Sequence, residues 1–451
     1  MSERVAPERS THPVLFLFMF VPMGISNGYV VVTLAYLLAT GGVTVDAIAM
    51  LGVWSLVPQL GKFLVGPLVD TTLTAKAWYL LATVATGLLI AVTGFVPATA
   101  ADLDLITVFV FFISVASAFS ALAADTIMAH ATKPEEKGRA GGWSQAGNLG
   151  GSAIGGGLGL WMAQTLTPTG SMAAGAWLAR HTGWTGFAEA GHWLGAHVDA
   201  AVAGSMTVGL LCVVTCAAIA YVREPVTDTR SDSFIRNIVN VGRDLWALLK
   251  SRRGLVAFVA MFLPIGAAAM TQLWSAVAKD WHADANAVAM INGMLGGVLN
   301  IIGCIAGGWL ADRMNRMLAF NLSSLLCAAV ALAAAFSPRT ETTYMVYVGI
   351  YMLIAGFCFA TWAAVVLEAI GAGAAATKYN VLAGIANGPI MYLSWLDGQA
   401  HNIWKVPSWL PVDGTTLMLL TEASLPVLGT LVLVAFMVLT RPFYKNSPTT
   451  G

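Results

Sequence analysis

Three charged residues, Lys62, Asp125 and Glu368, fall inside stretches of the chain that are otherwise apolar. A charge in hydrocarbon is costly, so such a side chain normally pairs with an opposite charge or faces water. If the single Lys62 ammonium pairs with Asp125, Glu368 is left over, and burial favours its protonated form. We therefore predict reversible proton binding by Glu368, with Asp125 as a second candidate. For Asp125 and Glu368, a role as solvated gate residues is an equally good interpretation. For Lys62, a functional or ion-pairing role is favoured over extension of the side chain to the membrane surface.

A short motif that combines an acid with basic residues occurs twice, 242 residues apart. In each copy a glycine precedes an aspartate by four positions at the end of an apolar stretch, and two arginines follow the second copy. An acid in this place can pair with basic residues or meet the positive end of a helix. The alternative is ordinary loop charge. The motif residues are Gly66, Asp70, Gly308, Asp312, Arg313 and Arg316.

The repeat extends beyond this motif. Phe20-Val-Pro-Met-Gly24 reappears as Phe262-Leu-Pro-Ile-Gly266 at the same offset, and Asp125 falls within one position of Glu368. Such repetition predicts two copies of one unit, which in membrane proteins face each other across a substrate pathway. The two prolines predict local kinks beside that pathway, or ordinary helix bending.

Neutral polar and aromatic residues near the middle of the apolar stretches are candidates for the lining of a cavity. Amides mixed with aromatic rings suit a sugar-like or amphipathic solute, through hydrogen bonds and stacking. Any one amide on its own is better explained as a hydrogen bond between helices. The set comprises Asn27, Tyr29, Trp54, Gln59, Asn148, Gln272, Asn300, Trp362 and Asn387.

The composition of the chain is that of an all-α membrane protein, whose helices must position these residues. Hydrophobic residues make up 57% and charged residues 10%, whereas a soluble domain carries about 25% charged residues. Closed barrels are excluded, because the apolar runs lack alternation and are too long for spanning strands. Twelve runs are long enough to span a bilayer: 13–38, 43–66, 77–97, 104–129, 140–164, 200–222, 255–278, 286–310, 317–337, 342–370, 378–396 and 416–440.

The distribution of basic residues predicts that both termini are cytoplasmic. With that orientation the outer side carries four basic residues, Arg180, Lys279, Arg339 and Lys405, while nearly all the others lie inside. The first apolar run is too long for a cleavable signal. The five cysteines fall inside predicted helices, which argues against disulfides. We expect a bacterial cytoplasmic (inner) membrane location.

The predicted organisation is a six-helix bundle over 1–222, a cytoplasmic amphipathic linker over 223–253, and a second six-helix bundle over 254–451. The linker is basic on one face, which suits an anionic lipid surface or a simple tether. Two external insertions, 165–199 and 397–415, are rich in Trp and His, and the first is expected to lie on the surface as a cap. Their spacing contains no tight ligand pattern, so we expect no metal and no cofactor.

A ladder of small residues marks the fifth run, where glycine recurs every fourth residue at Gly147, Gly151, Gly155 and Gly159. Such faces let helix backbones approach closely in lipid.

The duplicated motif resembles the loop motif of the major facilitator superfamily, whose acid and basic residues lock the cytoplasmic helix ends together in one conformer. The first copy departs from it, because Thr71-Thr-Leu-Thr-Ala intervenes before Lys76.

Within that superfamily the chain is similar to AmpG-type muropeptide permeases and their acetyl-CoA-transporter relatives. Three segments carry the likeness: Lys62-Phe-Leu-Val-Gly-Pro-Leu-Val-Asp70, Pro134-Glu-Glu-Lys-Gly138 with the fifth run, and Ala376-Thr-Lys-Tyr-Asn-Val-Leu382. Asp125 matches an acid retained in that group. An arginine that its members carry in the fifth helix is Leu149 here, so contacts to a charged ligand are altered.

The resemblance implies two six-helix bundles in a major-facilitator fold. It also implies secondary-active, proton-coupled import of a polar or amphipathic metabolite, with cell-wall sugar-peptide fragments as the first candidate. A siderophore or an acyl-CoA compound is the alternative. An integral-membrane transferase is disfavoured, since Asp125 and His130 point to different helix faces and no nucleophile accompanies them. The expected partners are a small-molecule substrate, protons and membrane lipid, with no nucleic acid and a monomeric state.

Overall fold

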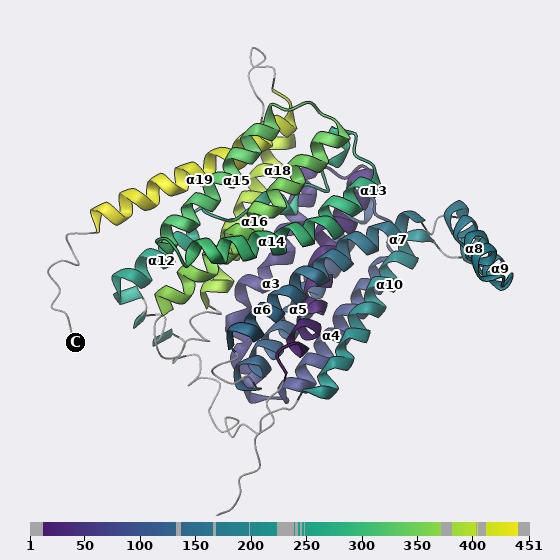
Figure 1. Ribbon diagram of the computed structural model, residues 1–451, viewed down its shortest axis with the longest axis horizontal. Helices are drawn as coiled ribbons and strands as arrows, with labels where there is room; N and C mark the ends of the chain where they lie inside the picture. Colours follow the sequence, from purple (N-terminus) through teal and green to yellow (C-terminus); the bar gives the residue numbers. More distant parts are fainter. Residues whose placement is uncertain are drawn as a thin grey trace, which may run out of the picture.

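The computed structural model describes residues 12–131, 137–165, 168–197, 199–222, 249–370, 381–402 and 412–440, with single residues at 239, 242, 243, 246, 247 and 404. Throughout these residues the regular elements are helices (Figure 1). The predicted linker and the segment 371–380 lie largely or wholly outside the described residues.

The first half of the chain forms a set of helical elements coloured purple to teal in Figure 1. In order they are α1 (Leu15–Gly28), η1 (Tyr29–Leu34), α2 (Ala35–Thr40), α3 (Val45–Thr71), α4 (Ala75–Thr93), η2 (Ala100–Asp102), α5 (Leu103–Ala131), α6 (Lys137–Ala153), η4 (Ile154–Leu158), α7 (Gly159–Thr165), α8 (Pro168–Thr182), α9 (Gly186–His197), α10 (Ala200–Thr215) and η5 (Cys216–Tyr221).

The second half forms the green to yellow set. Its elements are α12 (Arg252–Phe262), η7 (Ala269–Gln272), η8 (Ala278–Trp281), α13 (Ala285–Val288), η9 (Ala289–Met294), α14 (Leu295–Ala311), α15 (Arg316–Ala335), α16 (Glu341–Ile370), α18 (Asn387–Asn402) and α19 (Gly414–Leu439).

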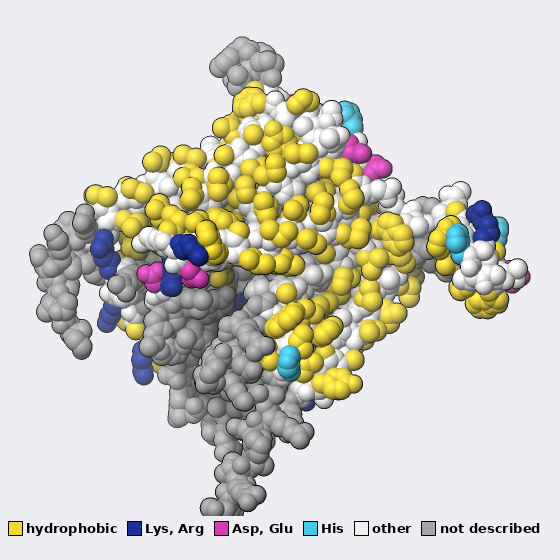
Figure 2. Space-filling view, viewed as in Figure 1, with side chains coloured by type: hydrophobic (Ala, Val, Ile, Leu, Met, Phe, Trp, Pro, Cys, Tyr) yellow, Lys and Arg dark blue, Asp and Glu magenta, His cyan; other side chains and the backbone are white. Residues whose placement is uncertain are grey.

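Each of the twelve predicted runs coincides with a helix or a series of helical segments. Eight helices in the described residues are long and apolar enough to cross a membrane. The other four runs, 43–66, 140–164, 255–278 and 378–396, correspond to α3, α6 with α7, α12 with η7, and α18. Where Figure 2 shows described residues, hydrophobic side chains are spread widely over both halves, which suits a lipid environment.

The two halves meet mainly through two groups of elements. Helix α3 packs on α18, while α6 and η4 pack on α14 and η9. Within the first half α1 packs on α6 and α4 on α5, and within the second α14 packs on α16 and α15 on α19. The interface therefore consists mainly of a few helices, and the remaining helices pack against these from the outer side of each half.

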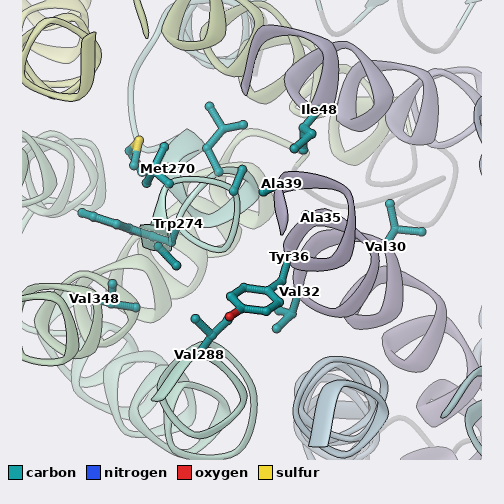
Figure 3. Packing of buried hydrophobic residues seen from close by; sticks show 14 of the residues in the cluster. Val30, Val32, Ala35, Tyr36, Ala39, Ile48, Met270, Trp274, Val288 and Val348 are labelled. Atoms are coloured by element: carbon teal, nitrogen blue, oxygen red, sulfur yellow. The ribbon is translucent and has the colours of Figure 1, made fainter. Parts of the chain in front are cut away.

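One end of the molecule is closed by a shared core. Residues of both halves join there in one hydrophobic cluster, in which Val32 and Tyr36 approach Val288 and Trp274 (Figure 3). Toward the other end each half has a cluster of its own, around Phe16 and Tyr79 in the first half and around Phe320 and Leu382 in the second. Among the described residues, the halves thus share one hydrophobic core at one end and have separate cores toward the other.

The repeated proline phrase has different outcomes in the two halves. Helix α1 continues through Pro22 into η1. In the second half α12 ends at Phe262, and the backbone takes left-handed conformations at Gly266 (φ 64°) and Ala268 (φ 48°) before η7 begins. Proline lacks an N–H, and the chain leaves the helix just before Pro264, which allows this irregular segment.

The first external insertion forms a hairpin of α8 and α9 that stands apart from the bundle beside α7 (Figure 1). Gly175 and Gly191 bring the two backbones together, since a Cβ on Gly175 would lie 2.4 Å from the Phe187 carbonyl oxygen. The expected surface cap is therefore a projecting helical hairpin.

Candidate functional site

A cavity of about 730 Å³ lies between the two halves. Its walls come from α1, η1, α6, η7, η9, α14, α16 and α18, so both halves contribute. This volume is in the range of small-molecule sites, roughly 300–1,000 Å³.

Five of the nine residues predicted for a cavity line this one: Asn27, Asn148, Gln272, Asn300 and Trp362. The first two belong to the first half and the other three to the second.

The other four predicted residues have partners elsewhere. Tyr29 is buried, with its hydroxyl 3.0 Å from Thr93 Oγ1. Trp54 packs edge-on against Phe111. The Gln59 and Asn387 amides donate to backbone carbonyls, those of Ser114 and Ala383. Of these four, Gln59 makes the kind of interhelical hydrogen bond that competed with the cavity interpretation, whereas Asn387 bonds to a carbonyl four residues earlier in the chain.

Asn292 and Gln272 present hydrogen-bonding atoms without partners. Asn292 Nδ2 donates to Tyr344 Oη at 2.6 Å, but Asn292 Oδ1 is buried and has no partner among the described residues. Gln272 Oε1 is also buried and has no partner among the described residues. Both residues line the cavity. A buried acceptor without a donor is costly, so these two oxygens are the natural positions for hydrogen bonds to a ligand.

Sequence reasoning missed Asn292, as well as Trp143, Gln145, Ser152 and Thr271 in the lining. For Asn292, the local helix geometry gives a reason. Asn292 lies in η9, a π-helical stretch, and η1 and η4 are π-helical too. An inserted residue rotates the following side chains relative to an α-helical pattern, and such bulges often occur at functional sites. The available signal was an asparagine within an apolar run, but the sequence did not indicate which face of the helix would carry it.

None of the described lining residues is Asp, Glu, Lys, Arg or His. Leu149, where the resembled permeases carry arginine, is part of the lining. The cavity therefore offers amides, hydroxyls and indole rings in apolar walls, which suits a neutral polar ligand.

Hydrogen bonds across the interface hold the closed end together. Lys279 Nζ donates to the Ala39 carbonyl oxygen at 2.5 Å, and Asn402 Nδ2 donates to Asp46 Oδ1 at 2.6 Å. A Cβ on Gly398 would lie 2.6 Å from the Ala49 Cβ, so α18 and α3 are in close contact there.

Next to this interface, His401 connects Asp280 to Asn402. His401 Nε2 lies 2.8 Å from Asp280 Oδ2, and His401 Nδ1 lies 2.5 Å from Asn402 Oδ1. Thr415 donates to the same Asp280 oxygen at 2.7 Å. Both ring nitrogens face acceptors, which is the pattern of an imidazolium ion.

Burial alone would lower the pKa of His401, but its bonds to Asp280 and Asn402 and the charges of Asp280 and Asp413 raise it above the usual value. Burial alone would raise the pKa of Asp280, but His401 and Thr415, together with the charge of Arg339, hold it below the usual value. Both pKa shifts favour the charged forms, so His401 and Asp280 form an ion pair.

Lys62 and Asp125 lie on neighbouring helices of the first half, α3 and α5. Lys62 is buried, and its charge acts on the Asp125 carboxylate. Neither residue is among those that line the cavity.

Glu368 differs from the expectation of a buried, surplus acid. Its side chain is 47% exposed, and Glu368 Oε2 lies 3.8 Å from Arg316 Nη1. Arg316 begins α15, beside the end of α16 that carries Glu368, and it supplies the counter-charge that the sequence argument lacked. The premise of an uncompensated buried acid is therefore wrong for Glu368, whose role in coupling or gating stays a prediction.

In the second copy of the gate motif, Arg313 stacks on the Trp309 ring, 3.8 Å from its centroid. Asp312 is exposed at the end of α14, and a Cβ on Gly308 would meet nothing within 4 Å. For the first copy, Gly66 and Asp70 lie within α3, and the Asp70 side chain lies outside the described residues.

Among the described residues no group of three or more His, Cys, Asp or Glu side chains is arranged to hold a metal ion.

Comparison with solved structures shows the same fold in several transporters. A nucleoside transporter, NupG, superposes with a TM-score of 0.63 at 13% identity, covering 94% of this chain and 98% of its own. A bacterial homolog to the human lysosomal transporter Spinster, inward-facing and unoccupied, gives 0.64 at 15% identity, covering 97% and 98%. The E. coli fucose:proton symporter FucP gives 0.56 at 15% identity, covering 94% and 98%. No curated protein matches the chain in sequence.

The model of one protein family matches residues 14–391, most of the chain, and its helices, cavity and two-part construction agree with that match. The protein is a member of the Major Facilitator Superfamily, a family of membrane transporters rather than enzymes.

Proposed function

We propose that this protein is a secondary-active transporter that moves a polar or amphipathic metabolite by alternating access. The observation that carries the proposal is the cavity between the halves, closed at one end by a shared core and direct hydrogen bonds. Rocking of the two bundles, 1–222 and 254–451, would open the closed end and close the other, with 223–253 as the cytoplasmic link.

The distribution of Lys and Arg supports an inward-facing arrangement. Lys279 and Arg339 belong to the closed end, and the positive-inside rule puts these residues outside. The open end then faces the cytoplasm, with both termini on that side of a bacterial inner membrane. The gate-motif residues Asp312, Arg313 and Arg316 would lie there and are free to change partners when the halves close.

The uncharged lining supports a neutral ligand group. The sugar portion of a cell-wall fragment has the hydroxyl and amide groups that Gln272 and Asn292 can bind, and a ring face that Trp362 can stack on. An acyl-CoA carries several phosphate charges, for which the described lining offers no cation. Cell-wall sugar-peptide fragments therefore remain our first candidate, with siderophores second. Import driven by protons is proposed, with Lys62 and Asp125 as candidates for coupling or gating and the exposed Glu368–Arg316 pair as a candidate for gating.

Counterflow in proteoliposomes tests transport apart from its energy source. Vesicles containing the protein are loaded with an unlabelled cell-wall disaccharide, with or without its peptide, and exchange against labelled solute is measured. We expect exchange for the sugar-containing solute and a loss of at least tenfold in Trp362→Ala. Trp395→Ala, on α18 but not part of the lining, is the matched control. Turnover of the solute without net movement would contradict the proposal.

A further inference from the structure

Two buried carboxyl groups lie against each other in the second half, away from the residues considered so far. Asp397 of α18 is 0% exposed and Glu422 of α19 is 1% exposed. The two carboxyl groups are within hydrogen-bonding reach of one another. An acid on each of two adjacent spanning helices is unusual, because a charge at membrane depth is costly.

The donors around this pair are distributed unequally. The Tyr351 hydroxyl donates to Glu422 Oε1, and the backbone N–H groups of Ala269 and Met270 lie beside the same carboxyl group. By contrast, Asp397 Oδ1 and Oδ2, and Glu422 Oε2, are buried without any donor among the described residues.

This arrangement requires a proton. Two carboxylates are both acceptors, so a hydrogen bond between them forms only if one is protonated, and like charges in contact cannot both remain ionised. Glu422 has the donors that stabilise an anion, whereas Asp397 has none. The geometry therefore assigns the proton to Asp397, which donates it to the Glu422 carboxylate.

The other ionisable groups that face the pair do not compensate its charge. They are the Tyr351 hydroxyl of α16 and the Cys327 and Cys358 thiols of α15 and α16, whose sulfurs lie 3.8 Å apart. All of them are neutral or become negative, and no Lys, Arg or His is among them in the part of the chain described. Loss of the shared proton would leave two negative charges in a buried site.

The pair is connected to the cavity through η7. Ala269 and Met270, whose N–H groups lie beside Glu422, are followed directly by Thr271 and Gln272 in the cavity wall. The segment before η7, with left-handed residues Gly266 and Ala268, is not helical, so it can change shape without breaking a continuous run of helical hydrogen bonds. A change of charge at the pair therefore acts on the backbone that positions Gln272.

We propose that the Asp397–Glu422 pair is the proton-binding site that drives transport, and that η7 transmits its protonation state to the ligand cavity. The inference rests on the proposed transport function. The step is a simple ionisation: the Asp397 O–H bond breaks, the proton passes to water, the electron pair stays on the carboxylate, and the pair changes from one negative charge to two. Water reaches the pair when the closed end opens.

The test has a readout that needs no substrate. Infrared spectra of the full-length protein in liposomes are compared between mildly acidic and alkaline buffer, and the band of a protonated carboxyl group is followed. We expect a buried protonated carboxyl in the wild type that Asp397→Asn removes. The asparagine amide still donates to Glu422, so this variant keeps the fold. Asp104→Asn, an exposed acid at the start of α5, is the control and should leave the band in place.

The same variants are then compared in transport of the labelled cell-wall disaccharide. Asp397→Asn should keep counterflow, but its accumulation driven by a pH gradient should fall at least tenfold. Asp104→Asn should keep both activities. Full driven accumulation by Asp397→Asn, or a carboxyl band that this change does not affect, would overturn the inference. If the wild type shows no counterflow, the proposed function fails, whereas the infrared result still decides whether the pair holds a proton.

Discussion

Glu368 and Arg316 form an ion pair at the surface, and this pairing changes what a substitution at Glu368 is expected to do. Exposed pairs of this kind contribute about 0–1 kcal/mol. We expect Glu368→Gln to reduce stability by less than about 1 kcal/mol and to keep accumulation driven by a pH gradient. Accumulation in proteoliposomes is the measurement. A loss as large as that of Asp397→Asn would restore Glu368 as the coupling acid.

Lys62 and Asp125 provide a second test at this scale. Removing one member of a buried charge pair leaves the other uncompensated, whereas removing both does not. Lys62→Ala should therefore reduce transport and thermal stability more than Lys62→Ala combined with Asp125→Asn. A double-mutant cycle on the unfolding temperature and on counterflow measures the coupling. Additive losses would show that the two residues act separately.

The glycines of the interface decide how closely the elements approach. A Cβ on Gly293 would lie 2.2 Å from the Gly157 Cα, where η4 of the first half meets η9 of the second. We expect Gly293→Ala to force this contact apart and to cost about 1–3 kcal/mol.

Gly150→Ala in α6 is the matched control for that change, because a Cβ there meets nothing within 4 Å. Replacing a helical glycine with alanine in open space stabilises a helix by roughly 0.5–1 kcal/mol. Thermal unfolding in detergent distinguishes the two variants. Equal midpoints for Gly293→Ala and Gly150→Ala would show that the halves are not in contact at η4 and η9.

The hairpin of α8 and α9 exposes Trp177, Trp184 and Trp193, each more than half exposed. Tryptophan concentrates at membrane interfaces, where its ring is apolar and its N–H stays hydrated. We expect the hairpin to lie at the lipid headgroup level. Brominated lipids should quench the fluorescence of these residues, and replacing all three with phenylalanine should remove that component of the quenching.

For the whole molecule, the His401 network predicts a pH dependence of the closed end. The raised pKa of His401 means that its contribution is present below its unfolded pKa and is lost as the pH rises through the folded one. The lowered pKa of Asp280 means that its contribution is present above its unfolded pKa and is lost as the pH falls through the folded one. The network should therefore be strongest at mildly acidic pH.

Thermal unfolding measured from mildly acidic to alkaline pH tests this prediction. The midpoint of the wild type should fall as His401 loses its proton, and His401→Gln should flatten that part of the profile. His181→Gln, in the exposed hairpin, is the control and should follow the wild type. An unchanged profile in His401→Gln would remove this histidine from the closure.

Much of the whole-molecule arrangement could be predicted from the residues. The twelve apolar runs and the phrase repeated at Pro22 and Pro264 predicted the helices and the two related halves, because lipid demands helices whose backbone groups are satisfied internally. The glycine ladder of the fifth run also predicted close packing, and Gly147, Gly151 and Gly155 do meet the backbone of α1.

The chemistry of individual side chains depended on neighbours from distant parts of the sequence. Asp397 fell in a segment that the sequence placed in an external loop, and Glu422 was one acid in a long apolar run; only the packing of α18 on α19 brings them together. Glu368 forms an ion pair with Arg316, and Asn292 lines the cavity from a π-helical turn. Hydropathy acts locally along the chain and fixes which segments are helices, whereas the state of a charge is fixed by whatever lies within a few ångströms of it, and that is decided by tertiary structure.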